Sequence, residues 1–88
     1  MEVTDSSTGI TARYGFSKEY GWRPMDMESY YAQQLMMHSE KITSDNLRAE
    51  MYDPISGERT NTTHFSSLSD DKHTAFSMLG IMRKPPRN

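Results

Sequence analysis

The fold class of this 88-residue chain is decided by one short stretch, Asp53-Pro54-Ile55-Ser56-Gly57. In a turn, Asp suits the opening position, Pro supplies the fixed φ of the next one, and Gly accepts the positive φ that closes it. Apolar and polar residues alternate before the turn, and the segment after it is rich in Thr and ends in Phe. Because such segments favour strands, we predict an antiparallel hairpin with strands at about 47–53 and 58–65.

A second interpretation of the first strand is helical. Ser44, Asp45 and Asn46 are good helix caps, and residues 44–52 would then form a second helix carrying Leu47 and Met51. We favour the strand because the turn that follows is typical of a hairpin.

Upstream of the hairpin, apolar residues repeat with helical spacing. Pro24 suits the first helical position, and Asp26 and Glu28 place negative charge in the first turn. The predicted helix covers about 25–41 and is amphipathic. Its core-facing stripe is expected to contain Met27, Tyr31, Leu35, His38 and Ile42, widened by Ala32 and Met36.

Downstream of the hairpin, the sequence predicts a helix over about 70–79. Ser69 is the expected N-cap, and Gly80 is placed to end the helix in a Schellman motif that presses Ile81 against Phe76. The residues expected to be buried are Ala75, Phe76, Met78 and Leu79. Residues 83–88 contain two prolines and are expected to form a basic tail.

The N-terminal part carries weaker patterns. Residues 1–9 are mostly short and polar, so we expect a flexible segment there. Apolar and polar residues alternate over 10–16, which favours a strand, and residues 17–23 are expected to form a loop. The whole pattern predicts one small α+β domain over 10–82, with both helices on one face of a small sheet.

Composition narrows the classes of function. The length excludes a two-domain enzyme, and the absence of cysteine excludes disulfides and thiolate metal sites. The N-terminus lacks the features of a signal peptide, and no apolar run is long enough to span a membrane, so we expect a cytoplasmic protein without a membrane partner.

A search for catalytic and ligand-binding motifs finds none that specifies a reaction. The chain has no phosphate-binding glycine loop, no G-x-S-x-G elbow and no H-E-x-x-H pair. His64, Asp70 and His73 could in principle ligate a metal, but a solvated helix start explains them more simply. We therefore expect a protein that is not an enzyme and binds neither a metal nor a cofactor.

Eight methionines are the most informative feature of the composition. Four of them lie at positions 25–37, and the adjacent pairs Tyr30-Tyr31 and Met36-Met37 point about 100° apart on a helix, so one member of each pair lies off the buried stripe. We therefore predict a non-catalytic regulator, adaptor or inhibitor that binds another protein, or a second copy of itself. The candidate partner-binding residues are Tyr20, Trp22, Met27, Tyr30, Tyr31, Met36 and Met37.

The alternative is a nucleic-acid-binding accessory protein. Aromatic and basic residues interleave between positions 13 and 23, and the tail is basic. The candidate residues are Arg13, Lys18, Trp22 and Arg23, with Arg83, Lys84 and Arg87 of the tail. Against this alternative, residues 24–60 contain three basic and seven acidic side chains, a net charge of −4 that would repel phosphates.

Overall fold

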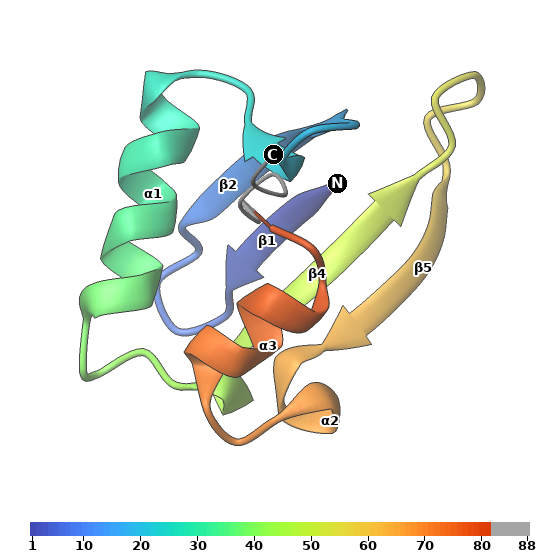
Figure 1. Cartoon of the computed structure of the whole chain (residues 1–88). Coiled ribbons are helices and arrows are strands. Elements are labelled where there is room, and N and C mark those ends of the chain that lie inside the picture. The colour runs from blue at the N-terminus through green and yellow to red at the C-terminus, as the bar shows by residue number, and fades with distance from the viewer. Residues whose placement is uncertain (82–88) are drawn as a thin grey trace.

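A computed structural model describes residues 1–81, which form a small α+β domain with a five-stranded antiparallel sheet and helices on one side of it (Figure 1). The strands are β1 (Glu2–Asp5), β2 (Thr11–Ser17), β3 (Gly21–Pro24), β4 (Leu47–Tyr52) and β5 (Arg59–His64), in the spatial order β3-β2-β1-β4-β5. The helices are α1 (Met27–His38), α2 (Phe65–Leu68) and α3 (Lys72–Met78), with a 3-10 turn η1 (Ser44–Asn46).

The predicted hairpin is confirmed. β4 and β5 pair antiparallel, and the backbone N–H of Gly57, at φ 74°, donates to the carbonyl of Asp53 over 2.8 Å. The carboxylate of Asp53 also accepts the N–H of Ile55 at 2.8 Å, as an Asx turn requires. The helical interpretation of 44–52 is wrong, because only the single turn η1 precedes β4.

The expectation of a flexible N-terminal segment is wrong. β1 is the central strand, with Val3 opposite Ala12 of β2 on one side and Ala49 of β4 on the other. Asp5 ends the strand and is fully buried. Burial alone would raise the pKa of Asp5, but hydrogen bonds from Thr8 and Ser7 outweigh it and hold the pKa below its usual range. Pairing on both sides compensates for the single apolar side chain of this strand.

The strand predicted at 10–16 is confirmed as β2, but the loop expected at 17–23 is wrong in its second half, which is β3. Pro24 ends β3 instead of opening α1. The N-cap of α1 is Asp26, whose carboxylate accepts the N–H of Ser29 at 2.8 Å. The helix therefore begins two residues later than predicted, at Met27.

The final helix was predicted correctly at its end but not at its start. Asp71, not Ser69, caps α3, since its carboxylate faces the backbone N–H of Thr74. At the other end the N–H of Gly80 donates to Ser77 O at 2.9 Å and that of Ile81 to Phe76 O at 3.3 Å, the two bonds of a Schellman motif. Ala75 and Phe76 are buried as expected; Leu79 is half-buried and Met78 is exposed.

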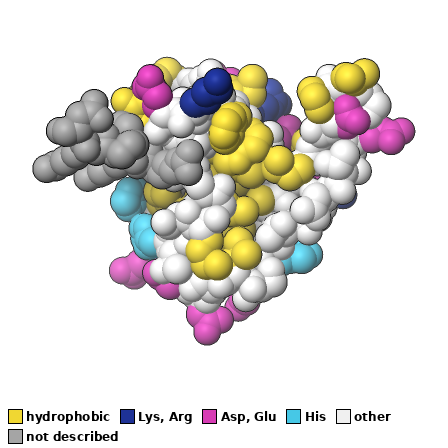
Figure 2. All heavy atoms as spheres, turned by 45° about the vertical axis from the view of Figure 1, so that its right-hand side comes forward, with side chains coloured by type: hydrophobic (Ala, Val, Ile, Leu, Met, Phe, Trp, Pro, Cys, Tyr) yellow, Lys and Arg dark blue, Asp and Glu magenta, His cyan; other side chains and the backbone are white. Residues whose placement is uncertain are grey.

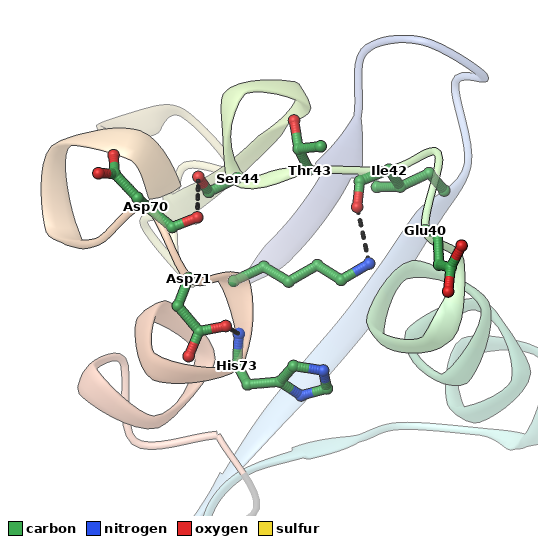
Figure 3. Close-up of a pocket in the computed structure, with 8 residues that line it drawn as sticks. Glu40, Ile42, Thr43, Ser44, Asp70, Asp71 and His73 are labelled. Atoms are coloured by element: carbon green, nitrogen blue, oxygen red, sulfur yellow. Dashed lines mark hydrogen bonds between the residues drawn. The ribbon is translucent and has the colours of Figure 1, made fainter.

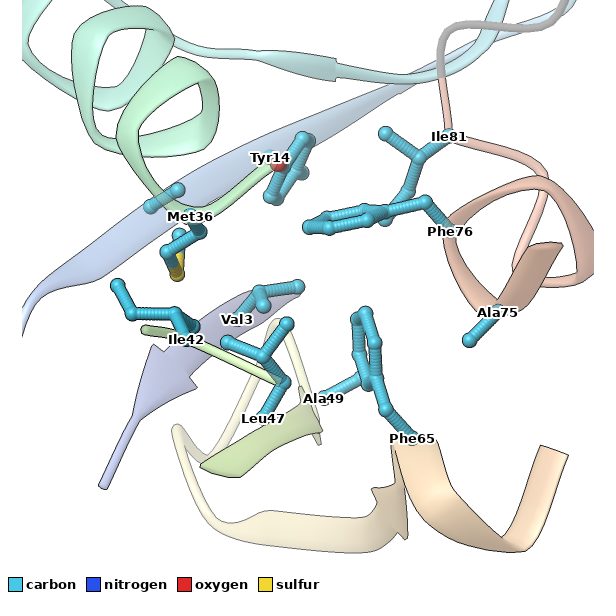
Figure 4. Close-up of a cluster of buried hydrophobic side chains, with 11 residues drawn as sticks. Val3, Tyr14, Met36, Ile42, Leu47, Ala49, Phe65, Ala75, Phe76 and Ile81 are labelled. Atoms are coloured by element: carbon cyan, nitrogen blue, oxygen red, sulfur yellow. The ribbon is translucent and has the colours of Figure 1, made fainter. Parts of the chain in front are cut away.

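The hydrophobic core lies between the sheet and the helices (Figure 4). Its rings include Phe65 and Phe76, which pack edge to face with centroids 4.8 Å apart. The buried apolar residues are Val3, Ala12, Tyr14, Met36, Ile42, Leu47, Ala49, Phe65, Ala75, Phe76 and Ile81. Side chains alternate along a strand, so the other face of the sheet points away from this core. The tail predicted at 83–88 lies outside the described residues.

None of the helices within residues 1–81 has the length and apolar character needed to cross a membrane.

Candidate protein-binding surface

Helix α1 is rotated relative to the prediction. Its buried side carries Ser29 and Gln33, which are 3% and 1% exposed, together with Met36. The apolar row that was expected to face the core faces solvent instead: Met27 is 62%, Tyr31 65% and Leu35 50% exposed. The three residues are four apart, so they form one continuous row along the helix, which we call the α1 ridge.

Polar docking explains this orientation. β3 pairs only with the second half of β2, which leaves the backbone N–H of Arg13 free to donate to Ser29 Oγ at 3.0 Å. One turn along, the hydroxyl of Tyr14 donates to Gln33 Oε1 at 2.7 Å. Burial raises the pKa of Tyr14, so its phenol remains a donor. These bonds and the packing of Met36 hold one side of α1 on the sheet, and the ridge is left outside.

A groove runs beside the α1 ridge. It has a volume of about 490 Å³ and lies where α1 meets the start of β2. Its apolar lining consists of Ile10, directly before β2, and of Tyr31, Ala32 and Leu35 on α1. Arg13 and Glu28 line it with opposite charges. Ridge and groove share Tyr31 and Leu35, so they make one continuous surface.

The predicted partner-binding residues of α1 do not all belong to this surface. Met27 and Tyr31 do, whereas Tyr30 and Met37 are half-buried. Met36 is fully buried in the core, so its assignment as a binding residue is wrong. Leu35 was missed as a binding residue because the same spacing was interpreted as a core stripe.

The two predicted aromatic residues of the β2–β3 hairpin have separate roles. The guanidinium of Arg23 lies 4.6 Å from the centre of the Tyr20 ring. Trp22 is half-buried, packs edge to face on Phe16 at 5.4 Å and pairs through its backbone with Ile81. Trp22 therefore ties the hairpin to the end of the α3 segment.

A second cavity, of about 290 Å³, lies between the loop after α1 and the start of α3 (Figure 3). Two of its polar side chains are engaged: Lys72 Nζ donates to the carbonyls of Ser39 and Ile42 at 2.5 and 2.7 Å, and Ser44 Oγ donates to Asp70 O at 3.0 Å. Burial lowers the pKa of Lys72. These hydrogen bonds hold the loop after α1 against α3, and the cavity lies at their contact.

The structure does not assemble the metal set considered from the sequence. Within residues 1–81, no group of three His, Cys, Asp or Glu side chains is placed to hold a metal ion, so His64, Asp70 and His73 do not converge. His73 instead lies near His38 of α1, with ring centroids 6.3 Å apart.

No protein-family model, curated protein or solved structure matches this chain.

Proposed function

We propose that this chain is a small non-catalytic protein-binding module, a regulator, adaptor or inhibitor, that docks its partner on the α1 ridge and the adjoining groove. The observation that supports it is the inverted helix: α1 buries Ser29 and Gln33 and leaves Tyr31 and Met27 in solvent. Burial favours the opposite arrangement by about 25 cal/mol for each Å² of apolar surface. A surface kept apolar against that preference is typical of an interaction site.

The shape of the ridge suits a helical or grooved partner. Side chains four residues apart form the ridges that interdigitate in the commonest class of helix packing. Met27 is unbranched and adapts to an irregular surface, while Tyr31 offers a large apolar ring with a polar end, a type enriched among residues that dominate binding energy.

The charged residues beside the ridge indicate which charges the partner should carry at the edge of its binding surface. Asp26 and Glu28 are exposed at the N-terminal end of the ridge, and Arg13 lines the groove with Glu28. We expect a partner with an apolar centre and basic residues where it meets the start of α1. Because the chain has no cysteine, a reducing compartment such as the cytoplasm is the setting we propose for this interaction.

Two variants test the proposal. Tyr31→Ala removes the centre of the ridge, and Ile55→Ala is its control, since Ile55 is 96% exposed at the hairpin tip, where Figure 2 shows apolar side chains beside acidic ones. Partners captured from the native host are identified by mass spectrometry, purified and titrated with each variant. We expect Tyr31→Ala to weaken binding about tenfold or more and Ile55→Ala to leave it unchanged.

Sedimentation of the purified chain covers the case in which the partner is a second copy, because Tyr31→Ala would then shift the monomer–dimer equilibrium. A strict monomer whose captured partners bind the Tyr31→Ala variant as tightly as the native chain would contradict the proposal.

A further inference from the structure

We propose that the open face of the sheet, on the side away from the core, binds single-stranded nucleic acid. The strand register defines that face. Glu2 lies opposite Arg13 and Glu50, Thr4 lies opposite Arg48, and Gly15 lies opposite Arg23. Directly opposed residues point to the same side of a sheet, and Val3, next to Glu2, points into the core.

All four arginines within residues 1–81 lie on this side, and we call them the arginine face: Arg13, Arg23, Arg48 and Arg59. Arg59 belongs to it because its Nε is 3.0 Å from Glu50 Oε2. None of the three described lysines lies in a strand. The fold therefore gathers one kind of cation on one surface, drawing from four of the five strands.

Two carboxylates lie among these arginines and do not neutralise them. Glu50 is shared, with Arg48 Nε at 2.6 Å and Arg59 Nε at 3.0 Å. Glu2 is 3.7 Å from Arg13 Nε. Hydrogen bonds from Arg48 and Tyr52 lower the pKa of Glu50, which is therefore ionised at neutral pH. Four guanidinium groups and two carboxylates leave a net charge of +2 on this face.

The acidic middle of the sequence does not oppose this assignment. Of the seven acids between residues 24 and 60, only Glu50 lies in a strand; the others lie on α1, its cap, η1 and the loops. The net charge of −4 is thus a property of the linear segment and not of the surface on which Arg48 and Arg59 lie.

Arginine chemistry favours a nucleic acid as the occupant. A guanidinium binds phosphate oxygens through two parallel hydrogen bonds and stacks on flat rings, which an ammonium group does not do. Arg23 already stacks on Tyr20, and Tyr52 lies on the same face beside Glu50. Cations interleaved with aromatic rings are the usual surface for a single strand, whose bases are free to lie flat.

The size of the face fits a short single strand. The arginines extend from β3 to β5, four strand spacings of about 4.8 Å, or about 19 Å in all. That width accommodates several nucleotides. The side chain of Arg13 is 66% exposed and that of Arg59 58%, so both have room to meet phosphates.

The test is fluorescence anisotropy of labelled oligo(dT) and oligo(U) of about 12 nucleotides with the full chain, across a range of salt concentrations. Arg13→Ala and Arg23→Ala remove cations of the face that lie outside the Glu50 cluster. Lys41→Ala removes the same charge from the loop after α1 and is the control. Circular dichroism confirms that each variant is folded.

We expect each arginine variant to weaken binding about fivefold at about 0.1 M salt and to flatten the salt dependence by about 0.7, the value for one phosphate contact on a single strand. The Lys41→Ala variant is expected to bind nearly as the native chain does. The arginine face shares Arg13 with the groove beside the α1 ridge, but it contains neither Tyr31 nor Leu35. Tyr31→Ala should therefore leave oligonucleotide binding intact, and Arg23→Ala should leave protein binding at the ridge intact, so either proposal can fail alone.

Four results would overturn the inference, the fourth of them a result with duplex DNA. One is no binding at low salt. Another is an equal loss in the arginine variants and in Lys41→Ala, which would indicate unspecific attraction. The third is binding that disappears in an Arg83→Ala, Lys84→Ala double variant while Arg13→Ala and Arg23→Ala bind normally. A duplex that competes as well as the single strand would refute the preference for single strands.

Discussion

The phenol of Tyr14 on β2 donates a 2.7 Å hydrogen bond to Oε1 of Gln33 on α1, and both side chains are buried. This bond ties α1, the longest helix within residues 1–81, to the sheet through a polar contact, and together with the Ser29 bond and the packing of Met36 it orients the helix. Removing the donor with Tyr14→Phe should lower the free energy of unfolding by about 1 kcal/mol, as measured by urea denaturation. Tyr31→Phe, at an exposed position, is the control and should change little. Equal stability of the two variants would show that the bond does not hold the helix.

The orientation of α1 is tested by two neighbouring residues. Met36 is fully buried and Leu35 is half-exposed. Met36→Ala should destabilise the fold by about 2–4 kcal/mol because it opens a cavity, while Leu35→Ala should cost less than about 1 kcal/mol. Thermal unfolding of both variants gives the comparison. The reverse order of effects would place the row containing Leu35 in the core and remove the basis for the α1 ridge.

The helix end at Gly80 offers a test of backbone strain. Gly80 has φ 76°, and a Cβ built there meets nothing within 4 Å, so Gly80→Ala changes conformational energy alone. We expect a loss of about 1 kcal/mol in unfolding free energy. Gly15→Ala is the matched control, since its added Cβ would lie 3.8 Å from Met25 Cγ, an ordinary contact. A Gly80 variant as stable as the Gly15 variant would contradict the Schellman ending.

Acid should destabilise the protein in part through Glu50. Hydrogen bonds from Arg48 and Tyr52 lower the pKa of Glu50 below its ordinary 4.5, although burial acts in the other direction. A carboxyl whose pKa is lower in the folded state stabilises the fold above its unfolded pKa, and this contribution is lost as the pH falls through the folded pKa. Glu50→Gln should therefore reduce stability at about pH 7 and lose most of that difference at about pH 3. Urea denaturation at each pH measures the difference in unfolding free energy between the native chain and Glu50→Gln. A difference that stays constant between these pH values would show that the ionised Glu50 does not stabilise the fold.

Local patterns in the sequence predict the hairpin and the end of α3. The turn at residues 53–57 and the positive φ of Gly80 depend on residue types within a few positions, so no distant contact is needed to infer them. The same is true of the alternation that predicts β2.

Distant contacts decide what the sequence could not. β1 has one apolar residue, Val3, and forms because strands on both sides pair with it. α1 carries two rows of side chains, and the buried one contains Gln33, whose partner Tyr14 is 19 residues away. The spacing of apolar residues predicts that the other row is buried, because it contains no information about that hydrogen bond.

The same lack of information about distant contacts explains why the candidate surfaces could be predicted only in part. The residue types indicate Met27, Tyr31 and Met36 as binding residues, while their spacing places all three in the core-facing stripe. Met27 and Tyr31 are exposed and Met36 is buried, and Leu35, which the spacing assigns to the core alone, is exposed. The sequence does not indicate Arg48 and Arg59 as binding residues, because the segment around them is acidic. Strand pairing, which joins distant segments, brings them to the same face as Arg13.

The central position of β1 has a consequence for the order of folding. The β1–β2, β2–β3 and β4–β5 pairs each join strands that are adjacent in the chain, whereas Val3 of β1 meets Ala49 of β4 across 46 residues. Because closing a long loop is slow compared with forming a local hairpin, the β1–β2–β3 meander and the β4–β5 hairpin should form first, and the pairing of β1 with β4 should come last. That pairing would then be the event that unites two separate halves into one cooperative unit.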